Sequence, residues 1–185
     1  MNGKYWCYTG MAALGLLHVF VFSLMLRPEV SDEYMDYYIT RETTMSPLQR
    51  RMLTPIEPGE SFDHHTVAIG FDGWSFAERD HRWSLGSSAK LVFLLDDAES
   101  AADAQHLVLR FATLGEQTVQ ISLNDEPLLE RRFDGAEEVE LRIEVPDSLL
   151  QEGENIVQFD LPDARKPDNG DARILAVALK SFSLS

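Results

Sequence analysis

The sequence predicts an all-β protein: a jelly-roll-like β-sandwich of about eight strands, preceded by one transmembrane α-helix and short juxtamembrane helices. Three observations support this fold class. A charge-free apolar run comes first, a polar stretch with helix-start signals follows, and β-prone segments separated by turn residues make up the rest. We therefore divide the chain into a membrane signal anchor at 1–26, a juxtamembrane linker at 27–58 and the β-sandwich at 59–185.

Residues 5–26 form the expected anchor, because they contain no Asp, Glu, Lys or Arg. Such a run measures roughly 33 Å as a helix, enough for a bilayer core of about 30 Å. Tyr5, Trp6 and Tyr8 cluster at one end, as aromatic residues do at a membrane interface. The alternative is a cleaved signal peptide, whose apolar core is usually only ~7–15 residues long.

Charge gives the expected orientation. All 31 acidic residues and 15 of the 16 basic residues follow Leu26, whereas Lys4 and the amino terminus precede the run. The positive-inside rule then favours a cytoplasmic N-terminus. We expect a single-pass protein of the bacterial inner membrane with a periplasmic C-terminal domain. His18 lies in mid-span, where it either docks a partner or simply hydrogen-bonds a neighbouring helix.

The linker contains two helix-start signals, at Ser31 and at Ser46-Pro47, and the second helix should end by residue 53. The first helix would place Tyr34, Tyr37 and Tyr38 on one face. This tyrosine face either docks a partner or lipid headgroups, or packs on the protein's own domain.

The sandwich is expected from alternating apolar and polar residues. In residues 139–145, four apolar side chains alternate with Glu140, Arg142 and Glu144, so one face is dry and the other wet. Two such sheets packed about 10 Å apart would bury one core. The predicted strands are 66–71, 90–95, 106–111, 118–123, 128–133, 139–145, 156–161 and 174–182.

Composition and motifs exclude several functions. A net charge of −15 without a basic stripe argues against nucleic-acid binding, and the single Cys excludes an internal disulfide and a Cys-based zinc site. The sequence has no G-x-S-x-G, S-x-x-K or Gly-rich phosphate loop. His64 and His65 would point to opposite faces of a strand, which speaks against a metal site with His81. We expect no catalytic residue, metal or cofactor.

Residues 70–84 are the most informative segment, because two tryptophans stand among acidic and basic residues. Tryptophan rings stack on sugar rings, while carboxylates and guanidinium groups bind hydroxyls. The candidate ligand-binding residues are Trp74, Glu78, Trp83 and Arg173. Two alternatives stay open: one or both tryptophans fill the core, and Arg173 forms a structural ion pair with Asp171 or Glu78.

The same segment resembles a known family. Gly73-Trp74-Ser75, Glu78 and Arg82-Trp83-Ser84 resemble the G-W-S…E…G-R-W-S signature of a bacterial extracytoplasmic β-sandwich. That domain is attached to membrane glycosyltransferases and phosphoglycerol transferases acting on envelope glycans. The resemblance covers about residues 56–185 and includes Leu123-Asn124, 153–156 and 171–175. His81 and Ala176 stand where Gly is usual, and the family's catalytic membrane domain has no counterpart in this sequence.

The resemblance and the anchor together suggest a non-enzymatic membrane accessory protein. Its carbohydrate-binding-like sandwich would assist synthesis or modification of a cell-envelope glycan. The alternative is a structural subunit that docks onto a multi-pass membrane glycosyltransferase or transporter without touching sugar, through His18, Tyr34, Tyr37 and Tyr38. The expected partners are thus an envelope glycan, such a membrane complex and the lipid bilayer, and not nucleic acid. A hydrolase or transferase is a third possibility.

Overall fold

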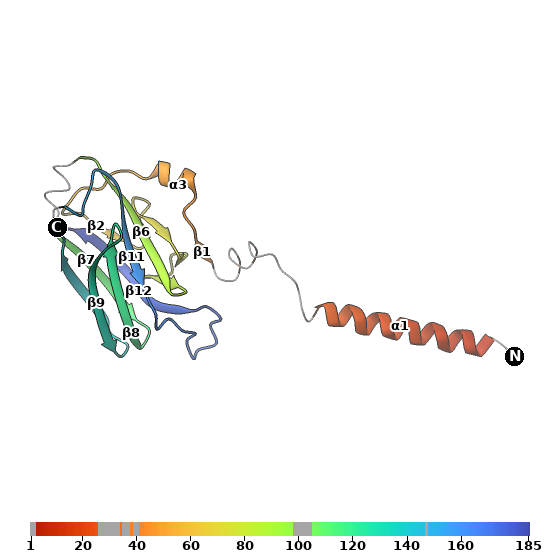
Figure 1. Ribbon diagram of the computed structural model, residues 1–185. Coiled ribbons are helices and arrows are strands. Elements are labelled where there is room, and N and C mark those ends of the chain that lie inside the picture. Colours follow the sequence, from red (N-terminus) through yellow and green to blue (C-terminus); the bar gives the residue numbers. More distant parts are fainter. Residues whose placement is uncertain (1–2, 26–33, 35–37, 39–40, 98–104, 147) are drawn as a thin grey trace. The chain divides into compact units, whose positions relative to one another are not determined.

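The structure is a computed structural model that describes residues 3–25, 34, 38, 41–97, 105–146 and 148–185. The chain forms two compact units, Met1–Met35 and Asp36–Ser185. Figure 1 shows the helix of the first unit and the layered strands of the second. Each unit is treated separately below.

The first unit contains the helix α1 (Gly3–Met25). The side chains described along it are exposed, including Leu16 and Phe20 at 72% and 60%. In the described part of the chain, no helix combines the length and the apolar character needed to cross a membrane. The predicted helix at 5–26 is therefore confirmed as a helix, whereas its membrane-spanning role is not.

The second unit is a β-sandwich, as predicted. Its elements are β1 (Glu42–Thr43), α3 (Pro47–Met52), β2 (Ser61–Asp63), β3 (Gly70–Asp72), β4 (Trp74–Ser75), β5 (Arg82–Leu85), β6 (Ser88–Leu95), β7 (His106–Thr113), β8 (Glu116–Leu123), β9 (Glu126–Asp134), β10 (Glu138–Glu144), β11 (Gly153–Asp160) and β12 (Leu175–Leu184).

These strands form two antiparallel sheets (Figure 1). One sheet has the order β1-β4-β5-β12-β7-β10, with β2 also paired to β12. The other has the order β3-β6-β11-β8-β9. The strand composition and the two-sheet arrangement agree with a jelly-roll-like sandwich. Seven of the eight predicted strands coincide with long strands, from β6 to β12.

The core lies between the sheets and is built by alternation. Val139, Leu141 and Ile143 of β10 are buried, while the charged residues between them are exposed. Every second residue of β7 and β8 is buried in the same way. Phe93, Phe111 and other fully buried side chains from both sheets meet in one cluster. Burial of this apolar surface is the main force that holds the sheets together.

The sandwich unit begins at Asp36, well before the predicted boundary at 59, because residues 41–58 pack on the sheets. β1 pairs with β4, and Thr43 Oγ1 donates to the carbonyl of Trp74 at 2.7 Å. The predicted second linker helix is α3, with a complete capping box between Ser46 and Gln49. Arg50 of α3 pairs with Glu154 of β11 at 2.8 Å. The helix predicted to start at Ser31 falls outside the described residues.

The first predicted strand differs from the structure. Residues 67–69 form bends, and within the predicted strand only Gly70 and Phe71 pair, as part of β3. The short strands β1, β2, β4 and β5 were not predicted. They extend the sheet beside β12 and thereby bring the segments around residues 41, 76 and 173 to one edge of the sandwich.

Candidate functional site

Trp74 lies in the core, so its predicted role in stacking on a sugar is wrong. The residue is 0% exposed. Its ring packs edge-on against Phe159 and Phe71, with centroid distances of 5.4 and 6.5 Å. The indole Nε1 donates to the carbonyl of Lys90 at 2.9 Å, which satisfies the buried N–H. Trp74 therefore anchors the short strand β4 to the other sheet.

Trp83 points to the opposite side of its sheet. Ser84, the next residue, pairs with Trp74 and is buried, so alternation turns Trp83 outward. Trp83 pairs with Ala178 of β12 and is half-buried. Its ring contacts the His81 ring edge-on at 5.2 Å. The two tryptophans therefore do not form one concave patch.

Glu78 and Arg173 are brought together, as the ion-pair alternative predicts. Arg173 Nη1 lies 2.9 Å from Glu78 Oε1, and Arg173 Nη2 lies 2.7 Å from Asp171 Oδ2. One guanidinium thus joins the loop after β4 to the loop before β12. The hydrogen bond from Arg173 holds the pKa of Asp171 below its ordinary value of 3.8. The same bond raises the pKa of Arg173, although partial burial opposes this.

His81 links Trp83 to this ion-pair cluster. Its Nδ1 lies 2.7 Å from Asp80 Oδ1, and its Nε2 lies 3.5 Å from Glu78 Oε2. The second distance is too long for a strong hydrogen bond. The Asp80–His81 hydrogen bond lowers the pKa of Asp80. Glu78 pairs directly with Arg173 and lies beside His81, whose ring contacts Trp83, so three of the four predicted ligand-binding residues lie in one cluster.

A cavity of about 590 Å³ opens beside Arg173, and we call it the polar pocket. Phe76 and Tyr38 contribute aromatic rings that are 38% and 59% exposed. Charged side chains of both signs complete the lining. The lining residues are Tyr38, Arg41, Phe76, Ala77, Glu78, Asp171 and Arg173. Two predicted ligand-binding residues, Glu78 and Arg173, thus line this cavity together with Tyr38.

Sequence reasoning missed two important residues of the polar pocket. Arg41 has a positive φ of 53°, and its carbonyl accepts the N–H of Phe76 at 2.8 Å. This bond positions Phe76 at the rim. The signals in the sequence were weak, because a single exposed arginine and a single phenylalanine are common on protein surfaces.

The histidines depart from the geometry expected of a strand. β2 ends at Asp63, and His64 and His65 lie in a turn, with ring centroids 4.2 Å apart. They do not point to opposite faces. His64 is 8% exposed, and its Nε2 has no hydrogen-bond partner in the described structure. In the described portion of the chain, no three His, Cys, Asp or Glu side chains are grouped to hold a metal ion.

The predicted partner-docking residues lie in both units. His18 Nδ1 is 2.8 Å from the carbonyl of Leu14, within its own helix. Tyr34 is in the first unit, Tyr38 is in the second, and Tyr37 lies outside the described residues. Their shared face stays a prediction, while Tyr38 gains a place at the polar pocket.

No family model matches the chain, and no curated protein matches it significantly. Several solved structures have a similar arrangement. One is an acetyl xylan esterase, Est2A, from the rumen bacterium Butyrivibrio proteoclasticus. It has 12% sequence identity and a TM-score of 0.45, and the match covers 68% of this chain and 32% of that one. The carbohydrate-binding module CBM36 in complex with calcium and xylotriose has 13% identity and a TM-score of 0.43, covering 68% of this chain and 99% of that one. A family 35 carbohydrate binding module from an environmental isolate has 14% identity and a TM-score of 0.42, covering 68% and 92%.

The chain spans about a third of the length of the esterases, at 31% and 32% for two of them. With TM-scores below 0.5, these similarities do not assign a function to this chain. The resemblance to a domain of membrane glycosyltransferases likewise stays a prediction.

Proposed function

We propose that the sandwich unit is a non-enzymatic carbohydrate-binding domain and that its ligand occupies the polar pocket. The observation that carries this proposal is the lining of that pocket. Phe76 and Tyr38 offer exposed aromatic surface, on which the C–H face of a sugar ring stacks. Arg41 and the Glu78–Arg173 pair supply donors and acceptors for hydroxyl groups.

The electrostatics support binding rather than catalysis. A general acid needs a carboxyl group whose pKa is raised toward neutrality. Arg173 instead lowers the pKa of Asp171 and also binds Glu78. The Asp171 carboxylate is thereby held as a hydrogen-bond acceptor, and the Glu78 carboxylate accepts a hydrogen bond from the same guanidinium.

Binding of glycans to the full-length chain tests this proposal. We expect an array of envelope polysaccharide fragments to give at least one ligand, and calorimetry to give a dissociation constant for it. Tyr38→Ala and Arg41→Gln should each weaken this binding about tenfold, the equivalent of ~1.4 kcal/mol. Arg79→Gln is the matched control, because Arg79 is an exposed arginine of the same edge that does not line the pocket. No ligand on the array, or equal losses in all three variants, would contradict the proposal.

We further propose that residues 5–26 tether this domain to the bacterial inner membrane, with the sandwich in the periplasm, as an accessory to synthesis or modification of an envelope glycan. The support is the absence of charge across residues 5–26 and the exposed apolar side chains around α1. A helix that is apolar on all sides is normally buried in protein or in lipid. We expect the chain to stay in membranes that are washed with alkali. We also expect protease to digest the sandwich only after the outer membrane is opened.

Docking onto a multi-pass glycosyltransferase or transporter is the second candidate, because the exposed helix α1 suits a helical partner as well as lipid. Cross-linking from residue 18 in membranes distinguishes the two. A protein adduct at that position supports docking, whereas lipid adducts alone contradict it.

A further inference from the structure

An apolar groove lies next to the polar pocket. It has a volume of about 750 Å³ and runs between α3, the bends at residues 67–69 and β3. Both volumes fall within the ~300–1,000 Å³ typical of ligand sites. Its apolar lining residues are Met45, Met52, Leu53, Val67, Ile69, Phe71 and Phe76. Among them Val67 and Met52 are 89% and 72% exposed, so they present apolar surface at the groove.

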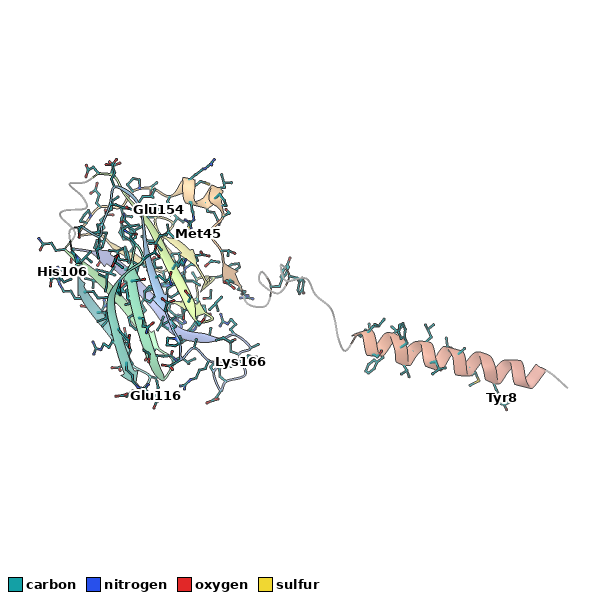
Figure 2. The ribbon with its side chains drawn as sticks, viewed as in Figure 1. Tyr8, Met45, His106, Glu116, Glu154 and Lys166 are labelled. Atoms are coloured by element: carbon teal, nitrogen blue, oxygen red, sulfur yellow. The ribbon has the colours of Figure 1, made fainter. Side chains whose placement is uncertain are left out.

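The walls of the groove are built into the fold. The Arg50–Glu154 ion pair fixes α3 to β11. Met45 lies over Gly70, and a Cβ on Gly70 would fall 1.9 Å from the Met45 sulfur. Figure 2 shows Met45 and Glu154 on the part of the sandwich that carries α3. The Met45 side chain can adapt to the shape of a ligand, because methionine is unbranched and polarizable.

Phe76 belongs to both cavities, because it lines the groove and also the polar pocket. Of the described exposed large hydrophobic residues of the sandwich unit, Tyr38, Met52, Val67 and Phe76 line one of these two cavities, whereas Leu48 and Ile174 line neither. One edge therefore places an apolar cavity directly against a polar one, with a single aromatic side chain between them.

Arg82 provides a cation in the groove. Its Nη1 donates to the carbonyl of Ser75, the residue before Phe76, at 3.0 Å, and its Nε donates to the carbonyl of His64. Its guanidinium carbon lies 4.2 Å from the centre of the Phe71 ring. Burial lowers the pKa of Arg82. The carboxylate of Glu42 also lines this groove, so the lining contains charges of both signs. The main-chain carbonyls that Arg82 contacts are neutral, so its half-buried positive charge favours an anionic ligand group.

We propose that this edge binds one amphiphilic molecule, an anionic glycolipid. This inference rests on the carbohydrate binding proposed above. Its hydrocarbon chain occupies the apolar groove, its anionic linker lies against Arg82, and its sugar or polyol head occupies the polar pocket. Because Phe76 lines both cavities, one molecule with an apolar and a polar part can occupy them together.

Photo-crosslinking of the full-length chain in phosphatidylcholine nanodiscs tests this assignment. The probe is lysophosphatidylinositol with a diazirine on its acyl chain, which combines a cyclic polyol, a phosphate and one hydrocarbon chain. Peptide mapping should place adducts in residues 42–54 and 64–82. Competition then tests each part of the ligand. Unlabelled probe should suppress these adducts at a concentration at least tenfold lower than that needed with inositol 1-phosphate, which lacks the chain, or with lysophosphatidic acid, which lacks the inositol ring.

Met52→Glu and Val67→Glu should each reduce labelling of these peptides about tenfold, because a carboxylate in the groove opposes both the chain and the phosphate. Both positions are strongly exposed, so the fold should tolerate the change. Leu48→Glu is the matched control, since Leu48 is 67% exposed on the same helix but does not line the groove. Arg82→Gln should weaken labelling by this probe but not by a neutral alkyl glucoside with the same diazirine chain.

Two results would overturn the inference. One is labelling confined to α1. The other is groove labelling that lysophosphatidic acid suppresses as well as the full probe does, because the site would then recognise only the chain and the phosphate. In the first case glycan binding by the polar pocket can persist, so failure of the glycolipid site is distinguishable from failure of carbohydrate binding.

Discussion

Glu78 and Arg173 lie 95 residues apart in the chain, yet their side chains meet at 2.9 Å. The ion pair fastens the loop after β4 to the loop before β12. Because Arg173 also holds Asp171, a single guanidinium organises one side of the polar pocket. Most of its hydrogen-bonding capacity is therefore engaged within the protein, and a ligand would meet a preformed arrangement of charges.

Replacing Arg173 with Met should lower the free energy of unfolding by about 1–3 kcal/mol at pH 7, because two carboxylates lose their charged partner. Urea denaturation measures the change. Arg132→Met is the control, since the ion pairs of Arg132 with Glu116 and Asp134 are exposed and should contribute less than ~1 kcal/mol. Equal effects of the two substitutions would contradict a structural role for the Arg173 cluster.

The Asp171–Arg173 hydrogen bond predicts a pH dependence. Folding lowers the pKa of Asp171 below 3.8, so its contribution to stability is complete above that value. The contribution is lost as the pH falls from about 3.8 through the lower pKa of the folded state. Thermal unfolding between pH 7 and pH 2 should show a smaller acid-induced loss for Arg173→Met than for the wild type. An unchanged acid dependence would show that Asp171 titrates normally.

Trp74→Ala should destabilise the sandwich by about 3–5 kcal/mol, because it empties a fully buried site between the sheets. Trp74→Phe retains most of the buried surface but loses the Nε1 hydrogen bond to Lys90, so the loss should be smaller. Denaturant titration gives both values. The informative comparison is glycan binding by folded Trp74→Phe, which should match the wild type because this ring is shielded from ligand.

Gly73 occupies a position that only glycine fits. Its φ is +73°, and an added Cβ would lie 2.8 Å from the carbonyl oxygen of Ser88. Gly170 has a similar φ of +88° but open space around it. Gly170→Ala should therefore lower the free energy of unfolding by about 1–2 kcal/mol, which is the strain of a left-handed backbone conformation alone. Gly73→Ala should cost clearly more, as measured by the shift in melting temperature. The reverse order would contradict the close approach at Ser88.

Asn155 is fully buried in a hydrogen-bonded network at the start of β11. Its Oδ1 accepts from the N–H of Gln151 at 3.0 Å and from Asn124 Nδ2 at 2.9 Å. Asn155→Ala leaves buried groups unpaired and should cost at least ~2 kcal/mol. Gln120→Ala, on the exposed face of β8, should cost less than ~0.5 kcal/mol. Chemical denaturation distinguishes them, and a similar small effect of both would argue against the network.

The long strands were predictable from the sequence for a local reason. In β10, dry and wet faces alternate residue by residue, so the pattern alone indicates both the strand and its buried side. The same holds for β7 and β8. The helix-start signal at Ser46-Pro47 is equally local, and it marked the start of α3 correctly.

The short strands and the site were less predictable, because contacts distant in sequence determine them. β4 has two residues, and its inward-facing Trp74 depends on pairing with Ser84. Nothing near Trp74 in the sequence distinguishes a core residue from a ligand contact. The opposite charges of Glu78 and Arg173 made their pairing an explicit alternative. The place of Phe76 beside Arg41 could not be foreseen, since three separate segments build that edge.

The outermost strands β9 and β10 have a consequence for the protein at high concentration. Each ends a sheet, and each carries exposed charge along its length, as in Glu130, Arg131, Glu140 and Arg142. An unpaired strand edge can recruit an identical edge from another molecule, which leads to aggregation. Here, such recruitment would crowd carboxylates and guanidinium groups of two copies together. Pairing of two such edges would bury these charges, so the open margins of both sheets disfavour self-association.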